Sequence, residues 1–160
     1  MIPTIELLAN QKKRFLFDFP WVYSNEIKPS PALKEIKPGE ITHLVLNGKF
    51  LATGYFNPHS LIAFRSLTRK PNEKIDADFF KRRIEQAEKL RQVFYKTPFY
   101  RLVHAESDDL PGLIIDRFDK VFVVQLNTQG MEKLESYIVE ALEVAFKPDT
   151  ILLQYDSGRV

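Results

Sequence analysis

The residues of this sequence that could most directly do chemistry are basic side chains concentrated in its first half. Those best suited to contact phosphate are Lys12, Lys13, Arg14, Lys49, Arg65, Arg69 and Lys70. Phosphate contact requires only mobile positive charge near a groove, and it carries little sequence information. Each of these residues alone is typical of a solvated surface. As a set on one small module, they favour contact with an anionic partner.

The charge of the chain is unevenly distributed. The 160 residues carry 23 Lys and Arg against 21 Asp and Glu, a net charge of +2. Residues 1–70 hold 10 of the basic and 5 of the acidic residues, which leaves 13 and 16 for residues 71–160. A net +5 beside a net −3 favours an anionic partner for the first segment, although ordinary scatter of surface charge explains the counts equally well.

Several classes of active site are excluded or unsupported. The chain has no cysteine, which excludes thiolate zinc sites and cysteine nucleophiles. No two of its six glycines are separated by a single residue, so a dinucleotide fingerprint cannot form, and no two have the four-residue separation of a P-loop. The three histidines share no ligand spacing; they are His43, His59 and His104. The densest carboxylates are Asp108, Asp109 and Asp116, and a solvated turn is more typical of them than an acid–base pair. We predict no catalytic, cofactor-binding or metal-binding residue in this chain.

The sequence shows no targeting signal. No apolar run approaches the ~18 residues needed to cross a bilayer. Residues 1–10 lack the basic and apolar regions of a signal peptide. We therefore expect a soluble cytoplasmic protein without a membrane partner.

The first 70 residues predict a compact, mostly β module. Strands are expected at 4–7, 41–46, 50–56 and 61–66, and Asn47-Gly48 is a strong signal for a type I′ hairpin. Aromatic residues occupy every second position at Phe15, Phe17, Phe19, Trp21 and Tyr23. This alternation predicts one buried face of an extended segment, or a short helix broken by a proline. Trp21 and Tyr23 are expected in the core rather than as platforms for base stacking.

Residues 71–160 predict an α+β module after a polar linker at 68–74. A helix is expected after Asp76 as N-cap, with its inward face formed by Phe80, Ile84, Ala87, Arg91 and Phe94. Strands are expected at 99–105, 113–118, 121–126 and 151–155, with a second helix at 131–146. The fold class is therefore mostly β plus α+β, the second module having two helices against an antiparallel sheet.

Three long motifs occur in order along the chain. They are FPWVYS at 19–24, GKFLATGYFNPHS at 48–60, and YRLVHAESDDLPGLIIDR at 100–117, with an arginine at position 65 after the second. They resemble the HPWVFSG, G-x-F-L-A-x-G-Y-Y-N-P-x-S and Y-R-L-V-x-x-E-x-D-G-L-P-G-L-I-V-D-R motifs of one bacterial family. That family comprises the class I S-adenosylmethionine-dependent methyltransferases that modify C5 of a cytosine in 23S ribosomal RNA. Phe19 stands where the family has histidine, and Asp109 where it has glycine.

The resemblance implies a PUA-like β-barrel at 1–70 that binds RNA, followed by the family's central α+β domain at 71–160. It also implies that the Rossmann-like catalytic domain, with its cofactor glycines and catalytic cysteine, would lie beyond residue 160. The chain would then position ribosomal RNA without binding S-adenosylmethionine (SAM) or transferring a methyl group. The alternatives are a stand-alone non-catalytic RNA-binding or assembly module, or a defunct fragment. Whether the chain forms a homodimer stays open.

The motif residues also have purely structural interpretations. Gly48, Gly54, Asn57 and Pro58 are expected to serve backbone geometry rather than ligand contact. The segment from Glu106 to Arg117 is expected to be a turn in which Asp108 and Asp116 accept backbone N–H bonds. Contact of this segment with RNA or with a catalytic domain is the functional alternative.

Overall fold

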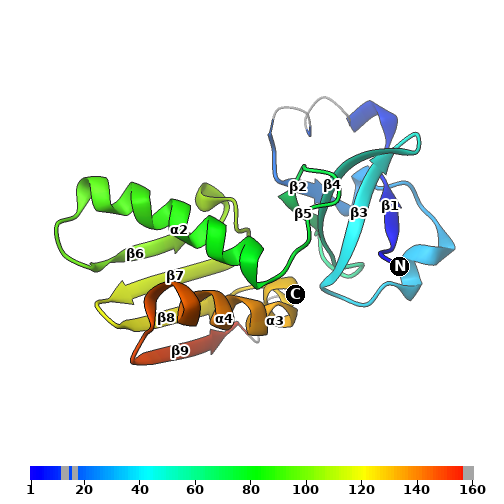
Figure 1. Cartoon of the computed structure of the whole chain (residues 1–160). Coiled ribbons are helices and arrows are strands. Elements are labelled where there is room, and N and C mark those ends of the chain that lie inside the picture. Colours follow the sequence, from blue (N-terminus) through cyan, green and yellow to red (C-terminus); the bar gives the residue numbers. More distant parts are fainter. Residues whose placement is uncertain (12–14, 16–17, 157–160) are drawn as a thin grey trace. The chain divides into compact units, whose positions relative to one another are not determined.

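The computed structural model describes residues 1–11, 15 and 18–156. They form two compact units, Met1–Glu73 and a second unit that begins at Lys74, and each unit has its own sheet (Figure 1). The first is mostly β and the second is α+β, which confirms the expected fold class. Within these residues, no helix is long and apolar enough to cross a membrane.

The first unit is a curled sheet of five strands in the order β1-β3-β4-β5-β2. The strands are β1 (Thr4–Glu6), β2 (Trp21–Tyr23), β3 (Glu40–Leu46), β4 (Lys49–Phe56) and β5 (Ile62–Thr68). Short 3₁₀ turns lie at η1 (Ala9–Gln11), η2 (Ser24–Glu26) and η3 (Pro31–Glu35). Strand β1 pairs parallel to β3, and the other pairs are antiparallel.

The two ends of this sheet meet just beyond its edge strands. Leu7, after β1, forms an isolated bridge with Ile27, after β2. The N–H of Leu8 donates to the Glu26 carbonyl at 2.8 Å, and the N–H of Lys28 donates to the Glu6 carbonyl at the same distance. These contacts bring the sheet towards a closed barrel, which encloses a core of buried apolar side chains such as Ile5, Leu44 and Phe64.

Two glycines set the geometry of strand β4, as the sequence predicts. Asn47 and Gly48 have φ values of 49° and 75°, which the type I′ turn between β3 and β4 requires. A Cβ on Gly54 would overlap the carbonyl oxygen of Arg65 and lie 2.7 Å from the Phe64 ring. The close approach of β4 and β5 therefore depends on a residue without a side chain.

The predicted face of alternating buried aromatics is wrong. Phe15 is buried, but Trp21 and Tyr23 are half-buried, and Phe17 lies outside the described residues. The core-facing residue of β2 is Val22, and successive strand residues point to opposite faces. Trp21 and Tyr23 therefore lie on the face of β2 turned away from the core.

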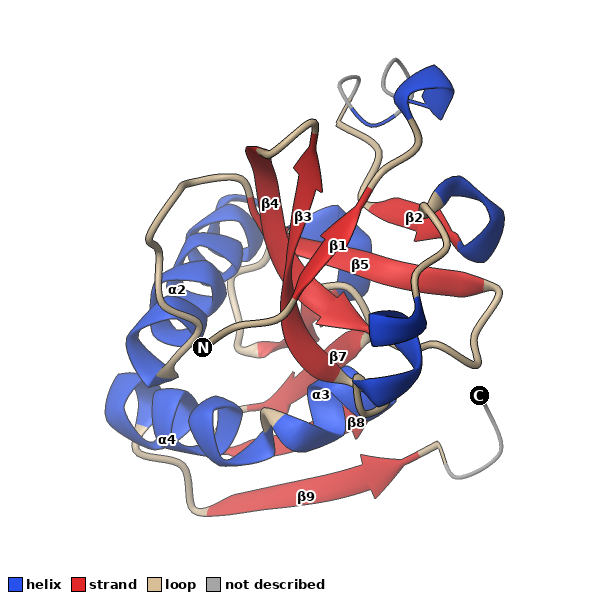
Figure 2. Ribbon diagram, turned by 90° about the vertical axis from the view of Figure 1, so that its right-hand side faces the viewer, coloured by secondary structure: helices blue, strands red, loops and turns tan. Residues whose placement is uncertain are grey.

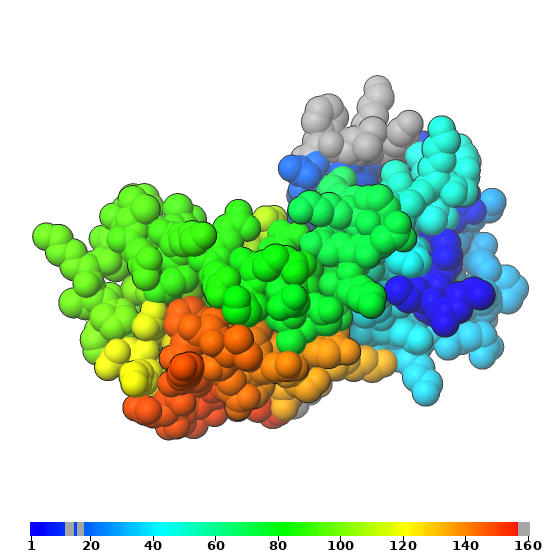
Figure 3. All heavy atoms as spheres, viewed as in Figure 1, coloured from blue at the N-terminus to red at the C-terminus, as the bar shows by residue number. Residues whose placement is uncertain are grey.

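The second unit is a four-stranded sheet in the order β6-β7-β8-β9, with helices on one face (Figure 2). Its elements are α2 (Ala77–Phe94), β6 (Phe99–His104), η4 (Ala105–Asp108), β7 (Leu113–Phe118), β8 (Val121–Leu126), α3 (Gln129–Lys133), α4 (Glu135–Phe146) and β9 (Thr150–Tyr155). Helices α2 and α4 lie side by side, as their green and orange atoms in Figure 3 show.

An antiparallel sheet was expected from the sequence, but this sheet is mixed. Strand β9 pairs parallel to β8, whereas β6, β7 and β8 are antiparallel. The chain returns from β8 to β9 through α3 and α4, and such a helical crossover joins parallel neighbours. The single helix expected at 131–146 is also divided, because Leu134 has φ −97° and ψ 5°.

Helix α2 begins as predicted. The Asp76 carboxylate accepts the N–H of Phe79 at 3.0 Å. Its buried face includes Phe80, Ile84 and Ala87, but Phe94, expected to point inward, is 74% exposed. Helical spacing puts Phe94 only about 20° from the buried Ala87, but Phe94 is the last residue of α2, where Val93 and Tyr95 are exposed as well.

Candidate nucleic-acid interface

Arginine and aromatic side chains form a continuous row on the first unit. Arg65 of β5 is the cross-strand neighbour of Trp21, and its guanidinium lies 5.5 Å from the centre of that ring. The Phe19 ring packs edge-on against Trp21 at 5.7 Å. Arg69 donates to the Phe19 carbonyl at 3.4 Å and lies 4.0 Å over the Phe15 ring. We call Phe15, Phe19, Trp21, Arg65 and Arg69 the arginine–aromatic row.

Arg69 is the most constrained member of the row. Its Nε is 3.4 Å from a carboxylate oxygen of Asp18, whose side chain is 92% exposed. Burial lowers the pKa of the Arg69 guanidinium, and the Asp18 carboxylate opposes that shift. An arginine remains protonated under such conditions. Arg69 therefore connects the segment before β2 to the end of β5.

The structure separates the other predicted phosphate contacts. Lys70 is exposed and directly follows Arg69, with its N–H bonded to Thr68 Oγ1 at 3.1 Å. Lys49 is exposed at the β3–β4 hairpin, six residues along β4 from Tyr55, which pairs with Arg65. At ~3.3 Å per residue this spacing is about 20 Å, so Lys49 does not join the row.

Lys12, Lys13 and Arg14 lie outside the described residues. In the sequence they come directly before Phe15, the first member of the row.

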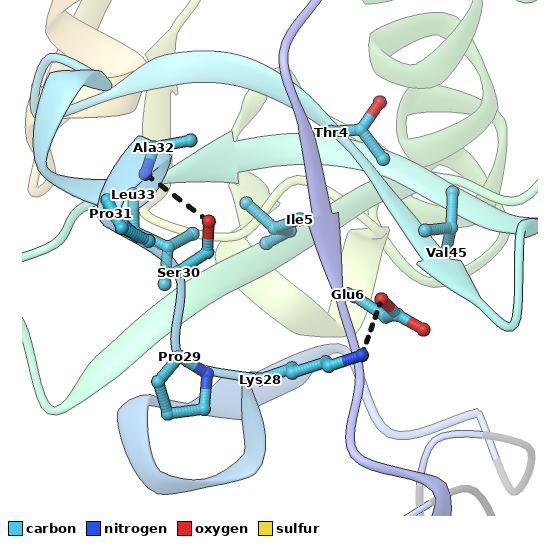
Figure 4. A pocket seen from close by; sticks show the side chains of 10 residues that line it. All are labelled: Thr4, Ile5, Glu6, Lys28, Pro29, Ser30, Pro31, Ala32, Leu33 and Val45. Carbon is cyan, nitrogen blue, oxygen red and sulfur yellow. Dashed lines mark hydrogen bonds and ion pairs between the residues drawn. The ribbon is translucent and has the colours of Figure 1, made fainter.

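A pocket of about 390 Å³ on the same unit lies beside β1 (Figure 4). Its lysine, Lys28, lies 3.6 Å from the Glu6 carboxylate, so the pocket walls carry no surplus of positive charge. Ser30, also in the wall, accepts the N–H of Ala32 at 3.3 Å. A paired lysine makes this pocket a weaker candidate for phosphate contact than the arginine–aromatic row.

The third sequence motif forms two cross-strand pairs in the second unit. Tyr100 lies opposite Arg117, and Arg101 lies opposite Asp116, on strands β6 and β7. Arg101 Nε and Nη2 donate to the two carboxylate oxygens of Asp116 at 2.9 and 3.3 Å. This fork explains the second and seventeenth positions of the motif by sheet geometry alone.

The other pair joins the sheet to helix α2. The Tyr100 hydroxyl lies 2.6 Å from both carboxylate oxygens of Glu88, and Arg117 Nη1 is 2.6 Å from one of them. Burial and the Glu88 carboxylate raise the pKa of Tyr100 to about 12. Glu88 was not among the residues predicted from the sequence, although a carboxylate on the apolar stripe of a helix is the signal that could have identified it.

Three aspartates of the third motif, Asp108, Asp109 and Asp116, form ion pairs. Asp108 accepts the N–H of His104 at 2.6 Å, as the sequence analysis predicted, and also binds Arg91 at 2.5 Å. Asp116 binds the Arg101 side chain instead of the expected backbone N–H. Asp109 has φ 58° and lies 3.2 Å from Arg83. Among the described residues, no group of three metal-ligating side chains could hold an ion.

The sequence and the fold of this chain are similar to those of known proteins. Residues 5–69 match the family model of a PUA-like domain. Over 146 residues, covering 89% of the chain, the sequence is 40% identical to "Ribosomal RNA large subunit methyltransferase I" of Aliivibrio fischeri strain MJ11. The chain is a homologue of this methyltransferase. The protein of the same name from Klebsiella pneumoniae strain MGH 78578 is 36% identical over 164 residues, covering the whole chain.

The chain spans only part of these relatives. The matched stretch is 36% of the Aliivibrio protein and 40% of the Klebsiella protein. A solved structure from Streptococcus mutans, described as a candidate SAM-dependent methyltransferase, superposes with a TM-score of 0.76 at 14% identity. That superposition covers 96% of this chain and 41% of the Streptococcus chain, and it supports the fold.

Proposed function

We propose that this chain binds ribosomal RNA and positions it for a SAM-dependent methyltransferase acting on C5 of a cytosine in 23S rRNA. The observation that carries the proposal is the 40% identity to a ribosomal RNA methyltransferase over 146 residues. The match spans 36% of that relative, and the 160 residues contain neither a cysteine nor a G-x-G turn. We therefore assign SAM binding and methyl transfer to residues other than these.

The proposal assigns RNA contact to residues 1–70 and the role of a central supporting domain to residues 71–160. The PUA-like match and the excess of positive charge both fall in the first segment. The Arg65 guanidinium packs over the Trp21 ring, which orients it. The side chain therefore loses little rotamer entropy when it contacts a phosphate. Lys12, Lys13, Arg14, Lys49, Arg69 and Lys70 supply the remaining charge. Such a protein works in the cytoplasm, where bacterial ribosomes are assembled.

Two binding measurements test this proposal. Fluorescence anisotropy with labelled fragments of 23S rRNA should show binding that weakens steeply as salt is raised, because phosphate contacts release counterions. Calorimetric titration with SAM should show no heat of specific binding. Absence of rRNA binding at low salt would overturn the RNA assignment, and a micromolar dissociation constant for SAM would overturn the assignment of cofactor binding to other residues.

A stand-alone RNA-binding or assembly module is the second candidate. The observation that favours it is the same lack of cysteine and of a G-x-G turn in the chain. Deleting the gene and measuring cytosine methylation in 23S rRNA by mass spectrometry separates the two. Loss of one methylated cytosine supports the methyltransferase proposal, and unchanged methylation together with an assembly defect supports the stand-alone module.

A further inference from the structure

A tryptophan lies on the outward face of an edge strand in the first sheet. Strand β2 is the last strand in the order β1-β3-β4-β5-β2 and lies beside β5 (Figure 2). Its contact with the core is Val22, which is 1% exposed, whereas the half-buried Trp21 points to the opposite face. Core packing therefore does not explain why a large aromatic ring stands at this position.

The neighbours of the Trp21 ring are suited to a nucleic acid. Arg65 lies over the ring at 5.5 Å, and Phe19 packs edge-on against it at 5.7 Å. Aromatic rings and arginine guanidinium groups are the surfaces on which proteins stack the bases of unpaired RNA. Because Trp21 is only half-buried, part of its indole is accessible to a base.

The charge around the ring favours RNA over an apolar protein partner. The arginine–aromatic row contains two arginines, and residues 1–70 carry 10 basic against 5 acidic residues. Glu26, just beyond β2, is 6% exposed, and its carboxylate accepts the N–H of Tyr23 at 2.7 Å, so it does not present its charge to the surface. An anionic ligand meets a complementary surface here, whereas an apolar partner would have to bury the arginines.

We propose that Trp21 is a stacking platform for one base of a single-stranded segment of ribosomal RNA, with Arg65 contacting the adjoining phosphate. This inference rests on the proposed function and adds the class of RNA that is recognised. Phosphate contacts alone carry no information about the bases. Stacking on Trp21 requires an unpaired base, because the bases of a duplex are stacked on one another.

The emission of Trp21 reports stacking directly, because it is the sole tryptophan of the chain. A single-stranded fragment of 23S rRNA should quench this emission in step with the binding measured by fluorescence anisotropy. Two controls keep the phosphates but offer no unpaired base: the same strand with abasic nucleotides, and the fragment annealed to its complement. Neither control should quench comparably.

The outcomes of this titration distinguish the inference from the proposed function. Binding of the single-stranded fragment without quenching, or equal quenching by the fragment and its abasic counterpart, would overturn the stacking and leave the proposed function intact. Absence of binding by every RNA would overturn both. The measurement uses the unmodified chain, so it decides the proposal whether or not a variant at Trp21 folds.

Replacement of the ring separates stacking from charge. Trp21→Leu should weaken binding of the single-stranded fragment about 5- to 150-fold, the range for the loss of one stacked base. The slope of log K against log salt should stay unchanged, because no phosphate contact is lost. Trp21→Phe retains an aromatic face and should recover most of the affinity.

Phe50→Leu is the matched control. Phe50 is a half-buried aromatic residue of β4 that packs edge-on against His43 at 5.5 Å, next to Lys49 and outside the arginine–aromatic row. This variant should bind RNA as the unmodified chain does. A flattened salt slope in Trp21→Leu, or equal losses of affinity in Trp21→Leu and Phe50→Leu, would overturn the proposal.

Discussion

Glu88 of α2 and Arg117 of β7 form a 2.6 Å ion pair whose side chains are only 10% and 17% exposed. The Tyr100 hydroxyl shares the same carboxylate. Removing one charge of such a pair leaves the other buried and uncompensated. We expect Glu88→Gln to lower the free energy of unfolding by about 3 kcal/mol, measured by urea denaturation.

The matched control lies on the same helix. Lys81 and Glu85 form a 2.9 Å ion pair with side chains 33% and 41% exposed. Because exposed pairs at this spacing contribute only ~0.3–0.5 kcal/mol, Glu85→Gln should change stability by less than about 0.5 kcal/mol. Equal effects of the two variants would mean that the Glu88 network does not hold α2 to the sheet.

The raised pKa of Tyr100 makes a prediction about alkaline pH. The pKa of Tyr100 is raised from 10.0 to about 12, by burial and by Glu88. A pKa raised by folding contributes stability that is fully present below the unfolded pKa and is lost as pH rises through the folded value. Stability should therefore fall more steeply between pH 10 and 12 in the unmodified chain than in Tyr100→Phe. Parallel curves from thermal unfolding at a series of pH values would contradict the assigned environment of Tyr100.

Replacing glycine by alanine should lower the free energy of unfolding by different amounts at Gly54 and at Gly48. In Gly54→Ala the new methyl group would collide with the Arg65 backbone, which a rigid sheet cannot move away. We expect a loss of 1–3 kcal/mol or more, roughly the cost of overpacking. In Gly48→Ala the methyl group would meet no atom within 4 Å, but φ is 75°, so the loss should be about 1 kcal/mol. A smaller loss for Gly54→Ala than for Gly48→Ala, in thermal unfolding, would refute the close approach of β4 and β5.

Features fixed by neighbouring residues could be predicted from the sequence. The Asn47-Gly48 hairpin and the Asp76 N-cap are examples, because each depends on backbone conformations that its own residue types favour. The apolar stripe of α2 was likewise recognised through Ile84 and Ala87, since helical spacing is a local property.

Features that depend on distant pairing could not be predicted in this way. The parallel pairing of β9 depends on where the chain returns after α4. The arginine–aromatic row depends on the register that sets Trp21 beside Arg65, residues 44 positions apart. The buried position of Glu88 is decided by Tyr100 and Arg117, which lie on two strands of the sheet. In each case the decisive partner is remote in sequence.

RNA affinity measured against salt tests the central claim most directly. The variant replaces Lys12, Lys13 and Arg14 with glutamate, which reverses their charge. A companion variant replaces the exposed Lys49 and Lys70 with glutamate. The control reverses Arg82, Lys89 and Lys96, exposed basic residues of the second unit. Each single-stranded phosphate contact contributes about −0.7 to the slope of log K against log salt.

We expect the triple reversal of residues 12–14 to weaken binding of a 23S rRNA fragment and to flatten that slope by about 2 units. The companion variant should weaken binding in the same direction, and the second-unit control should leave both affinity and slope nearly unchanged. Unchanged affinity in the triple variant, together with loss of binding in the second-unit control, would contradict RNA recognition by residues 1–70.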